Sequence, residues 1–173
     1  TAILWNVVNG EKLLTFRGHS RPVKSVAFSP DGRQVLTASE DYDAPIPEVC
    51  LWDATTGQRL RNLEGHTAYV RSLAFSPDGR RIITGAADGT AVLWDSDKGT
   101  RLRTLEHDKW VTGVAFTPAG RQIITAGNKV LVWSEVGSQQ LDARKGQTFP
   151  LSSMAITSDG RTVLVPASNG VIA

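Results

Sequence analysis

A tryptophan recurs along the chain at intervals of about forty residues, each time in a similar context: ILWN, CLWD, VLWD and LVWS. The four residues are Trp5, Trp52, Trp94 and Trp133. The motif FSPDG, or a close variant of it, recurs in step with the tryptophans. The pair Gly-His stands at 18–19 and 65–66, and a degenerate Glu-His pair stands at 106–107. A period of this length restricts the chain to a fold built from one repeating supersecondary unit.

The segments between these markers have the character of β-strands. VRSLAF at 70–75, RIIT at 81–84 and TAVLW at 90–94 are short, rich in β-branched residues and partly alternating in polarity. Turns rich in Gly, Pro and Asp separate them, and no segment has the periodicity of an amphipathic helix. The repeating unit is therefore predicted to be a four-stranded antiparallel meander. Stacked meanders bury each other's faces, and a closed ring protects their edges, so the sequence predicts an all-β propeller.

The motifs GH, FSPDG, ITGAADGT and VLWD of the central repeat resemble those of the WD-repeat β-propellers, and the resemblance covers nearly the whole chain. In that family a sequence repeat begins before the innermost strand of a blade. The resemblance thus implies three four-stranded blades at 18–64, 65–106 and 107–146. It also implies the outer two strands of an incomplete blade at 1–17 and the inner strands of another at 147–173, all in one propeller domain of about four blades.

The two incomplete blades leave the assembly of the chain open. We expect a fragment of a longer protein that forms an open arc, so that the first residue given is not taken as the true N-terminus. Two alternatives are that the half-blades pair within one chain to close a small ring, or that two chains pair head to tail. We further expect a cytoplasmic protein, because the single cysteine, Cys50, cannot form an internal disulfide.

The resemblance implies a buried hydrogen-bonded tetrad of His, Ser or Thr, Asp and Trp within a blade. The matching positions are His66, Thr84, Asp88 and Trp94 in the central blade and His19, Thr37, Asp41 and Trp52 in the preceding one. The third complete blade keeps Thr125 and Trp133, with His107 in the histidine position, but its turn is shorter and lacks the aspartate. We expect that end of the chain to be less stable.

A histidine, a hydroxyl and a carboxylate are also the groups of a nucleophilic hydrolase. The set occurs twice, however, and Thr84 follows Ile82 and Ile83 in an apolar strand, whereas a nucleophile needs exposure and an oxyanion site. We therefore expect no catalytic residues and no enzyme activity. A hydrolase that uses His66, Thr84 and Asp88 is a distant alternative.

The composition argues against several classes of ligand. The chain has 19 basic and 17 acidic residues, a net charge of +2, and the basic residues are scattered, so we expect no nucleic-acid partner. No apolar run approaches the roughly 18 residues of a membrane span. The three histidines are assigned to tetrads, which leaves no metal cluster, and no glycine-rich loop precedes a helix. We expect neither a metal nor another cofactor.

Protein or peptide partners are the expected ligands, and the loop rim of the propeller is the expected surface. The loop after Asp41 is five residues longer than its counterpart after Asp88, and aromatic residues stand just before the predicted first strand of two blades. A tolerated insertion and local aromatic packing are the alternatives at these positions. The candidate residues are Arg21, Glu40, Tyr42, Asp43, Tyr69, Lys109, Trp110 and Phe149.

The function predicted from the sequence is that of a non-catalytic WD-repeat scaffold for protein–protein interaction. The alternative is a sensor or regulatory propeller module fused to an enzymatic or signalling domain outside this segment.

Overall fold

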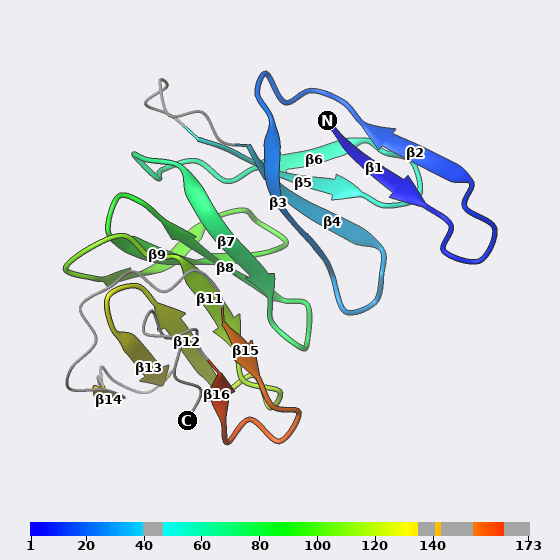
Figure 1. The fold of residues 1–173 in the computed structure, drawn as a ribbon. Helices are drawn as coiled ribbons and strands as arrows, with labels where there is room; N and C mark the ends of the chain where they lie inside the picture. The colour runs from blue at the N-terminus through cyan, green and yellow to red at the C-terminus, as the bar shows by residue number, and fades with distance from the viewer. Residues whose placement is uncertain (40–46, 135–140, 143–153, 165–173) are drawn as a thin grey trace, which may run out of the picture.

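A computed structural model describes residues 1–39, 47–134, 141–142 and 154–164 of the chain (Figure 1). Within these residues every regular element is a β-strand. The strands are β1 (Ala2–Trp5), β2 (Lys12–Phe16), β3 (Val23–Phe28), β4 (Gln34–Ser39), β5 (Glu48–Asp53), β6 (Arg59–Asn62), β7 (Val70–Phe75), β8 (Arg81–Ala86), β9 (Thr90–Asp95), β10 (Arg101–Glu106), β11 (Gly113–Phe116), β12 (Gln122–Ala126), β13 (Val130–Ser134), β14 (Leu141–Asp142), β15 (Ala155–Ile156) and β16 (Val163–Leu164).

The strands form a stack of antiparallel meanders. Three sheets have four strands each, in the orders β3-β4-β5-β6, β7-β8-β9-β10 and β11-β12-β13-β14. The two-stranded sheets β1-β2 and β15-β16 flank them. The first strands of neighbouring four-stranded sheets lie side by side, β3 beside β7 and β7 beside β11, so the sheets fan outward from these strands (Figure 1). This is the all-β meander that the sequence predicts.

The two flanking sheets lie at opposite ends of the stack (Figure 1). Phe16 of β2 packs with Val35 and Trp52 of the next sheet, while Ile156 of β15 packs with Ile124 at the other end. Within the described residues β1-β2 and β15-β16 make separate sheets and do not pair with each other. The described part of one chain is therefore an open series of sheets.

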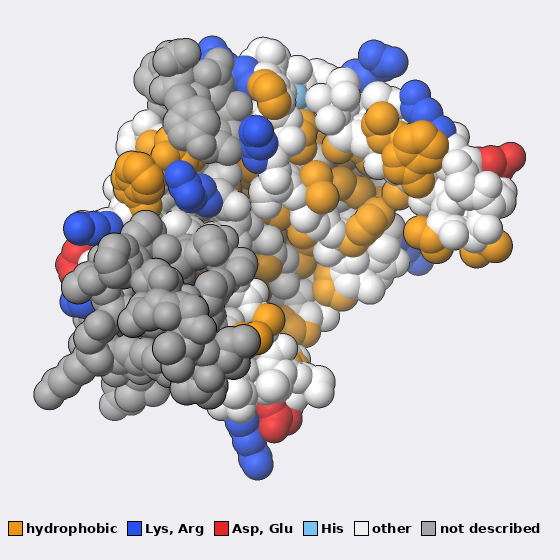
Figure 2. Space-filling model, in the orientation of Figure 1, with side chains coloured by type: hydrophobic (Ala, Val, Ile, Leu, Met, Phe, Trp, Pro, Cys, Tyr) orange, Lys and Arg blue, Asp and Glu red, His pale blue; other side chains and the backbone are white. Residues whose placement is uncertain are grey.

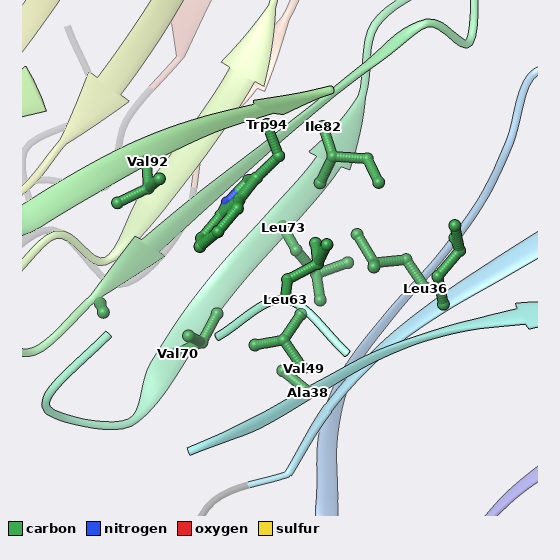
Figure 3. Packing of buried hydrophobic residues seen from close by; sticks show 11 residues of the cluster. Leu36, Ala38, Val49, Leu63, Val70, Leu73, Ile82, Val92 and Trp94 are labelled. Atoms are coloured by element: carbon green, nitrogen blue, oxygen red, sulfur yellow. The ribbon is translucent and has the colours of Figure 1, made fainter. Parts of the chain in front are cut away.

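The hydrophobic core lies between the sheets. Figure 3 shows one such layer, in which Leu36, Ala38 and Val49 of the β3–β6 sheet face residues such as Val70 and Trp94 of the next sheet. The next layer joins the β7–β10 sheet to the β11–β14 sheet. Because each layer lies between two neighbouring sheets, an isolated sheet would leave its apolar faces in water.

One glycine allows two sheets to approach closely. A Cβ atom placed on Gly85 of β8 would lie 2.6 Å from a methyl carbon of Val111 and 2.7 Å from one of Val114. Any side chain at this position would displace these valines, because real Cβ atoms do not approach other heavy atoms so closely.

The SPDG turns join the first and second strands of the sheets. In the turn between β7 and β8, the Ser76 hydroxyl donates to Asp78 over 2.6 Å, and Asp78 also accepts from the backbone N–H of Arg80. Gly79 has a φ of +72°, a conformation that favours glycine. The same bonds form around Ser29 and Asp31 in the turn between β3 and β4, which explains why the motif recurs at the same place in these two sheets.

The connections lie on two opposite rims. The loop rim carries the connections that lead into β7 and β11 (63–69 and 107–112) and the turn between β8 and β9 (87–89). The turn rim carries the SPDG turns and the turn between β9 and β10 (96–100). The rims are distinct because successive strands of an antiparallel meander run in opposite directions.

Some large apolar side chains of the first sheets are exposed. Trp5 of β1 and Val26 and Phe28 of β3 each expose more than half of their surface, at 53%, 60% and 54%. Hydrophobic side chains are visible over this part of the molecule in Figure 2. No described element covers them.

Candidate functional site

The tetrad of the β7–β10 sheet is a continuous hydrogen-bonded chain. His66 Nδ1 lies 2.8 Å from Asp88 Oδ2, and His66 Nε2 lies 2.7 Å from Thr84 Oγ1. The indole N–H of Trp94 donates to the same threonine oxygen over 2.8 Å. The Thr84 hydroxyl accepts from the indole N–H, which is only a donor, and the ionised Asp88 carboxylate is only an acceptor. Nδ1 therefore carries the imidazole proton and donates it to Asp88.

Asp88 accepts several further hydrogen bonds. Its oxygens receive the backbone N–H groups of Thr67 (3.0 Å) and Thr90 (2.9 Å) and the Thr90 hydroxyl (2.7 Å). Burial opposes ionisation of this carboxyl, but the hydrogen bonds from His66 and Thr90 outweigh it and hold the pKa of Asp88 well below its ordinary value. Asp88 thus ties the turn before β9 to the segment that leads into β7.

The preceding sheet uses a different acid. His19 Nε2 lies 2.6 Å from Thr37 Oγ1, which accepts from the Trp52 indole over 2.7 Å, but His19 Nδ1 lies 3.1 Å from Glu48 Oε2. Asp41, which the family pattern assigns to this position, lies outside the described residues.

Sequence reasoning missed Glu48. It is the first residue of β5, the position that Thr90 holds in β9. Its longer side chain reaches the histidine from the start of the strand. The long insertion before β5 is the signal in the sequence that the acid of this blade can come from a position other than the usual one.

The third complete sheet has a shorter network. His107 Nε2 lies 2.7 Å from Thr125 Oγ1, and the Trp133 indole donates to that oxygen over 2.8 Å. Within the described residues no carboxylate is hydrogen-bonded to His107 Nδ1. Burial lowers the pKa of His107 to about 4, so the ring is neutral at physiological pH.

The threonines of all three networks are fully buried, with Thr37, Thr84 and Thr125 each 0% exposed. A buried hydroxyl between a histidine and an indole offers no path to a substrate. The arrangement satisfies polar groups inside the sheets and holds their strands together. Among the described residues no group of three or more His, Cys, Asp or Glu side chains is arranged to hold a metal ion.

A second cluster lies on the loop rim, and we name it the arginine–aromatic cluster: Tyr69, Arg71 and Trp110. The guanidinium carbon of Arg71 lies 5.0 Å from the centroid of each aromatic ring, and its Nη2 donates to the Tyr69 hydroxyl over 3.1 Å. The rings are 6.2 Å apart and inclined at 67°. Trp110 is 49% exposed. The cluster joins two sheets and presents an indole face to solvent.

The model of the WD domain, G-beta repeat family matches residues 10–43, 57–95 and 99–134, together more than half of the chain. The chain belongs to the WD-repeat family. A solved structure described as "Crystal structure of RRP9 WD40 repeats" is similar to it, with a TM-score of 0.72 and 21% identity. The match covers 80% of this chain and 43% of that one, and at this identity the likeness shows the fold alone. No curated protein matches the chain.

WD-repeat propellers generally act as protein-interaction scaffolds and are generally without catalytic activity. In this WD-repeat chain none of the described residues forms a helix long and apolar enough to cross a bilayer.

The predicted rim residues have different places in this WD-repeat chain. Tyr69 directly precedes β7, as the sequence predicts. The sequence also predicts Trp110 directly before the first strand of its blade, but β11 begins only at Gly113. The backbone N–H of Val111 donates to Ala86 O in the neighbouring sheet, and that of Thr112 donates to Ala126 O. Regular pairing of β11 with β12 therefore begins only after these two residues.

The remaining candidates divide into two groups. Lys109 is exposed beside Trp110, and Arg21 lies in the connection ahead of β3. Four candidates lie outside the described residues: Glu40, Tyr42, Asp43 and Phe149. Arg71, the centre of the arginine–aromatic cluster, was missed because a single arginine inside a strand carries no signal in the sequence.

Proposed function

We propose that this WD-repeat chain is a non-catalytic scaffold that binds protein partners on its loop rim, at the arginine–aromatic cluster. The observation that carries the proposal is the packing of Tyr69, Arg71 and Trp110 into one preformed group with the indole half exposed. Trp, Tyr and Arg are the residues most enriched among those that dominate binding energy at interfaces.

The fixed position of the Arg71 side chain in the arginine–aromatic cluster supports this proposal. Arg71 is fixed by contact with two rings and by its bond to the Tyr69 hydroxyl, before any partner arrives. A side chain that is already ordered loses less conformational entropy on binding, so more of its contact energy appears as affinity. The rings come from segments that lead into two neighbouring sheets, and the stack itself therefore positions them.

Burial of the tetrad supports the non-catalytic part of the proposal. The histidine and threonine side chains that resemble hydrolase groups lie inside the sheets, and His66 and Thr84 are 4% and 0% exposed. Their hydrogen-bonding capacity is used within the network, so neither side chain is placed to act as a nucleophile at the surface.

The test is capture of partners by the full-length protein and by its Tyr69→Ala/Trp110→Ala variant. The matched control is Leu102→Ala, since Leu102 is an equally exposed apolar residue (51%) on the outermost strand β10. We expect the double variant to lose the partners that the wild type and the control retain, at an unchanged melting temperature. Partners kept by the double variant would refute the proposal.

A further inference from the structure

A pocket of about 470 Å³ lies on the loop rim beside Trp110. Three segments form it: the turn between β8 and β9, the connection into β11 and the turn between β12 and β13. Its lining residues are Ala87, Asp88, Gly89, His107, Asp108, Lys109, Trp110 and Asn128. The pocket thus joins the exposed indole of the arginine–aromatic cluster to the histidine of the third network.

The first two networks show how this fold holds a carboxylate. In each, one carboxylate oxygen accepts from the histidine Nδ1 and from the backbone N–H of the next residue. The backbone bonds are Ser20 N to Glu48 Oε2 and Thr67 N to Asp88 Oδ2, both 3.0 Å. Two donors with fixed geometry therefore point at one oxygen, and the arrangement recurs in neighbouring sheets.

The third network has the same donors. The Trp133 indole donates to Thr125 Oγ1, and among the hydrogen bonds of the described residues His107 Nε2 is the acceptor that this fully buried hydroxyl has for its own proton. The neutral ring then carries its proton on Nδ1. The backbone N–H of Asp108 follows this histidine as that of Thr67 follows His66. Within the described residues, no hydrogen bond joins a carboxylate to either donor.

The chain departs from the repeat at the position of the acid. The spacing from the network threonine to the tryptophan is two residues shorter here (Thr125 to Trp133) than in the preceding sheet (Thr84 to Trp94), and the turn between β12 and β13 carries Asn128 in place of an aspartate. The Asn128 side-chain oxygen is buried without a hydrogen-bond partner, and the residue lines the pocket.

We infer that the pocket takes a carboxylate of a bound protein segment, which accepts from His107 Nδ1 and the Asp108 N–H and so supplies the acid that this sheet lacks. The inference rests on the proposed function and names the chemistry of the partner, an acidic peptide. The carboxylate comes from an Asp or Glu side chain or from a chain terminus, and either source offers the same oxygens.

Two carboxylates, Asp88 and Asp108, and three cations, Lys109, Lys129 and Arg71, surround the pocket, an excess of one positive charge. Asp88 already accepts four donors, and Asp108 accepts from Lys129 Nζ over 3.1 Å. Lys109 on the pocket wall and Arg71 behind Trp110 add two positive charges. Trp110 supplies an apolar wall for the stem of the acidic side chain. The low pKa of His107 agrees with a neutral N–H donor at this position.

The test is a titration of the ¹⁵N-labelled full chain with three tripeptides, followed by NMR. The peptides are acetyl-Gly-Glu-Gly-amide, acetyl-Gly-Gln-Gly-amide and acetyl-Gly-Gly-Gly with a free C-terminal carboxylate. We expect one or both carboxylate peptides to shift the His107 Nδ1 and Asp108 amide signals together, and the glutamine peptide to bind at least about tenfold more weakly. The stronger of the two carboxylate peptides identifies the source. Equal shifts with glutamine, or none with any peptide up to about 20 mM, would overturn the inference.

Two variants localise the effect. Lys109→Glu and Asn128→Asp each place a negative charge in the pocket and are expected to weaken binding of the carboxylate peptide by about tenfold or more. Lys98→Glu makes the same charge change on the turn rim and is expected to leave it unaltered. If the Tyr69→Ala/Trp110→Ala variant loses partners while glutamate and glutamine peptides bind alike, the inference fails and the proposed function stands. If the double variant keeps its partners, the proposed function itself fails.

Discussion

Replacing Asp88 by alanine tests whether the tetrad holds the sheets together. The carboxylate accepts from His66 Nδ1, from the N–H groups of Thr67 and Thr90, and from the Thr90 hydroxyl. Its side chain is 9% exposed and that of His66 is 1% exposed, so water replaces these bonds poorly. The variant leaves a buried imidazole N–H and two backbone N–H groups without their acceptor.

The magnitude follows from the kind of bond lost. A hydrogen bond to a charged group contributes about 1.5–3 kcal/mol, and a buried donor left unsatisfied costs about 1–3 kcal/mol. Loop relaxation exposes the two backbone groups at the rim, so we expect a total loss of about 3 kcal/mol. For a chain of this length that loss lowers the melting temperature by about 6–12 °C.

Thermal unfolding followed by circular dichroism measures this loss. Asp97→Ala is the matched control, because it removes the same charge from an exposed position on the turn rim. Asp88→Asn should lie between the two, since it keeps the size of the side chain and loses its charge. A melting temperature for Asp88→Ala within a degree of wild type would refute the structural role of the tetrad.

Three further predictions use the same unfolding assay. Glu48→Ala should cost only about 1 kcal/mol, because Glu48 is 35% exposed, and a loss as large as that of Asp88→Ala would contradict this. Gly85→Ala should cost about 2 kcal/mol through its clash with Val111 and Val114, with partial rescue by Val111→Ala; an unchanged melting temperature would contradict the packing. Burial lowers the pKa of His107 from 6.5 to about 4, so the unfolded state binds more protons between these values. The stability contributed by neutral His107 should be complete above pH 6.5 and lost as the pH falls toward 4, and a His107 NMR titration with a midpoint near 6.5 would contradict it.

The fold was predictable from sequence because its signals are local and repeated. The SPDG turn is fixed by bonds within six residues, and a tryptophan marks the third strand of each four-stranded sheet. His66, Thr84, Asp88 and Trp94 could be named for the same reason, since they stand in register with those markers. The structure joins them by hydrogen bonds.

The features that sequence reasoning missed depend on contacts between sheets or on an insertion that shifts residues relative to the sequence repeat. Glu48 follows an insertion, which shifts the acid relative to the repeat. Arg71 could not be assigned to a cluster from the sequence, because its contact with Trp110, about forty residues further along, forms only when the sheets stack. The start of β11 depends on bonds from Val111 and Thr112 to two different sheets, and neither partner is local.

The most direct test of the central claim is site-specific photo-crosslinking on the full-length protein. A benzophenone amino acid replaces either Lys109 on the loop rim or Lys98 on the turn rim. Both lysines are exposed, and they lie in the connections at the two ends of β10. We expect partner adducts from position 109 and none from position 98. Adducts from position 98 alone would contradict it, because the partner would then bind the opposite rim.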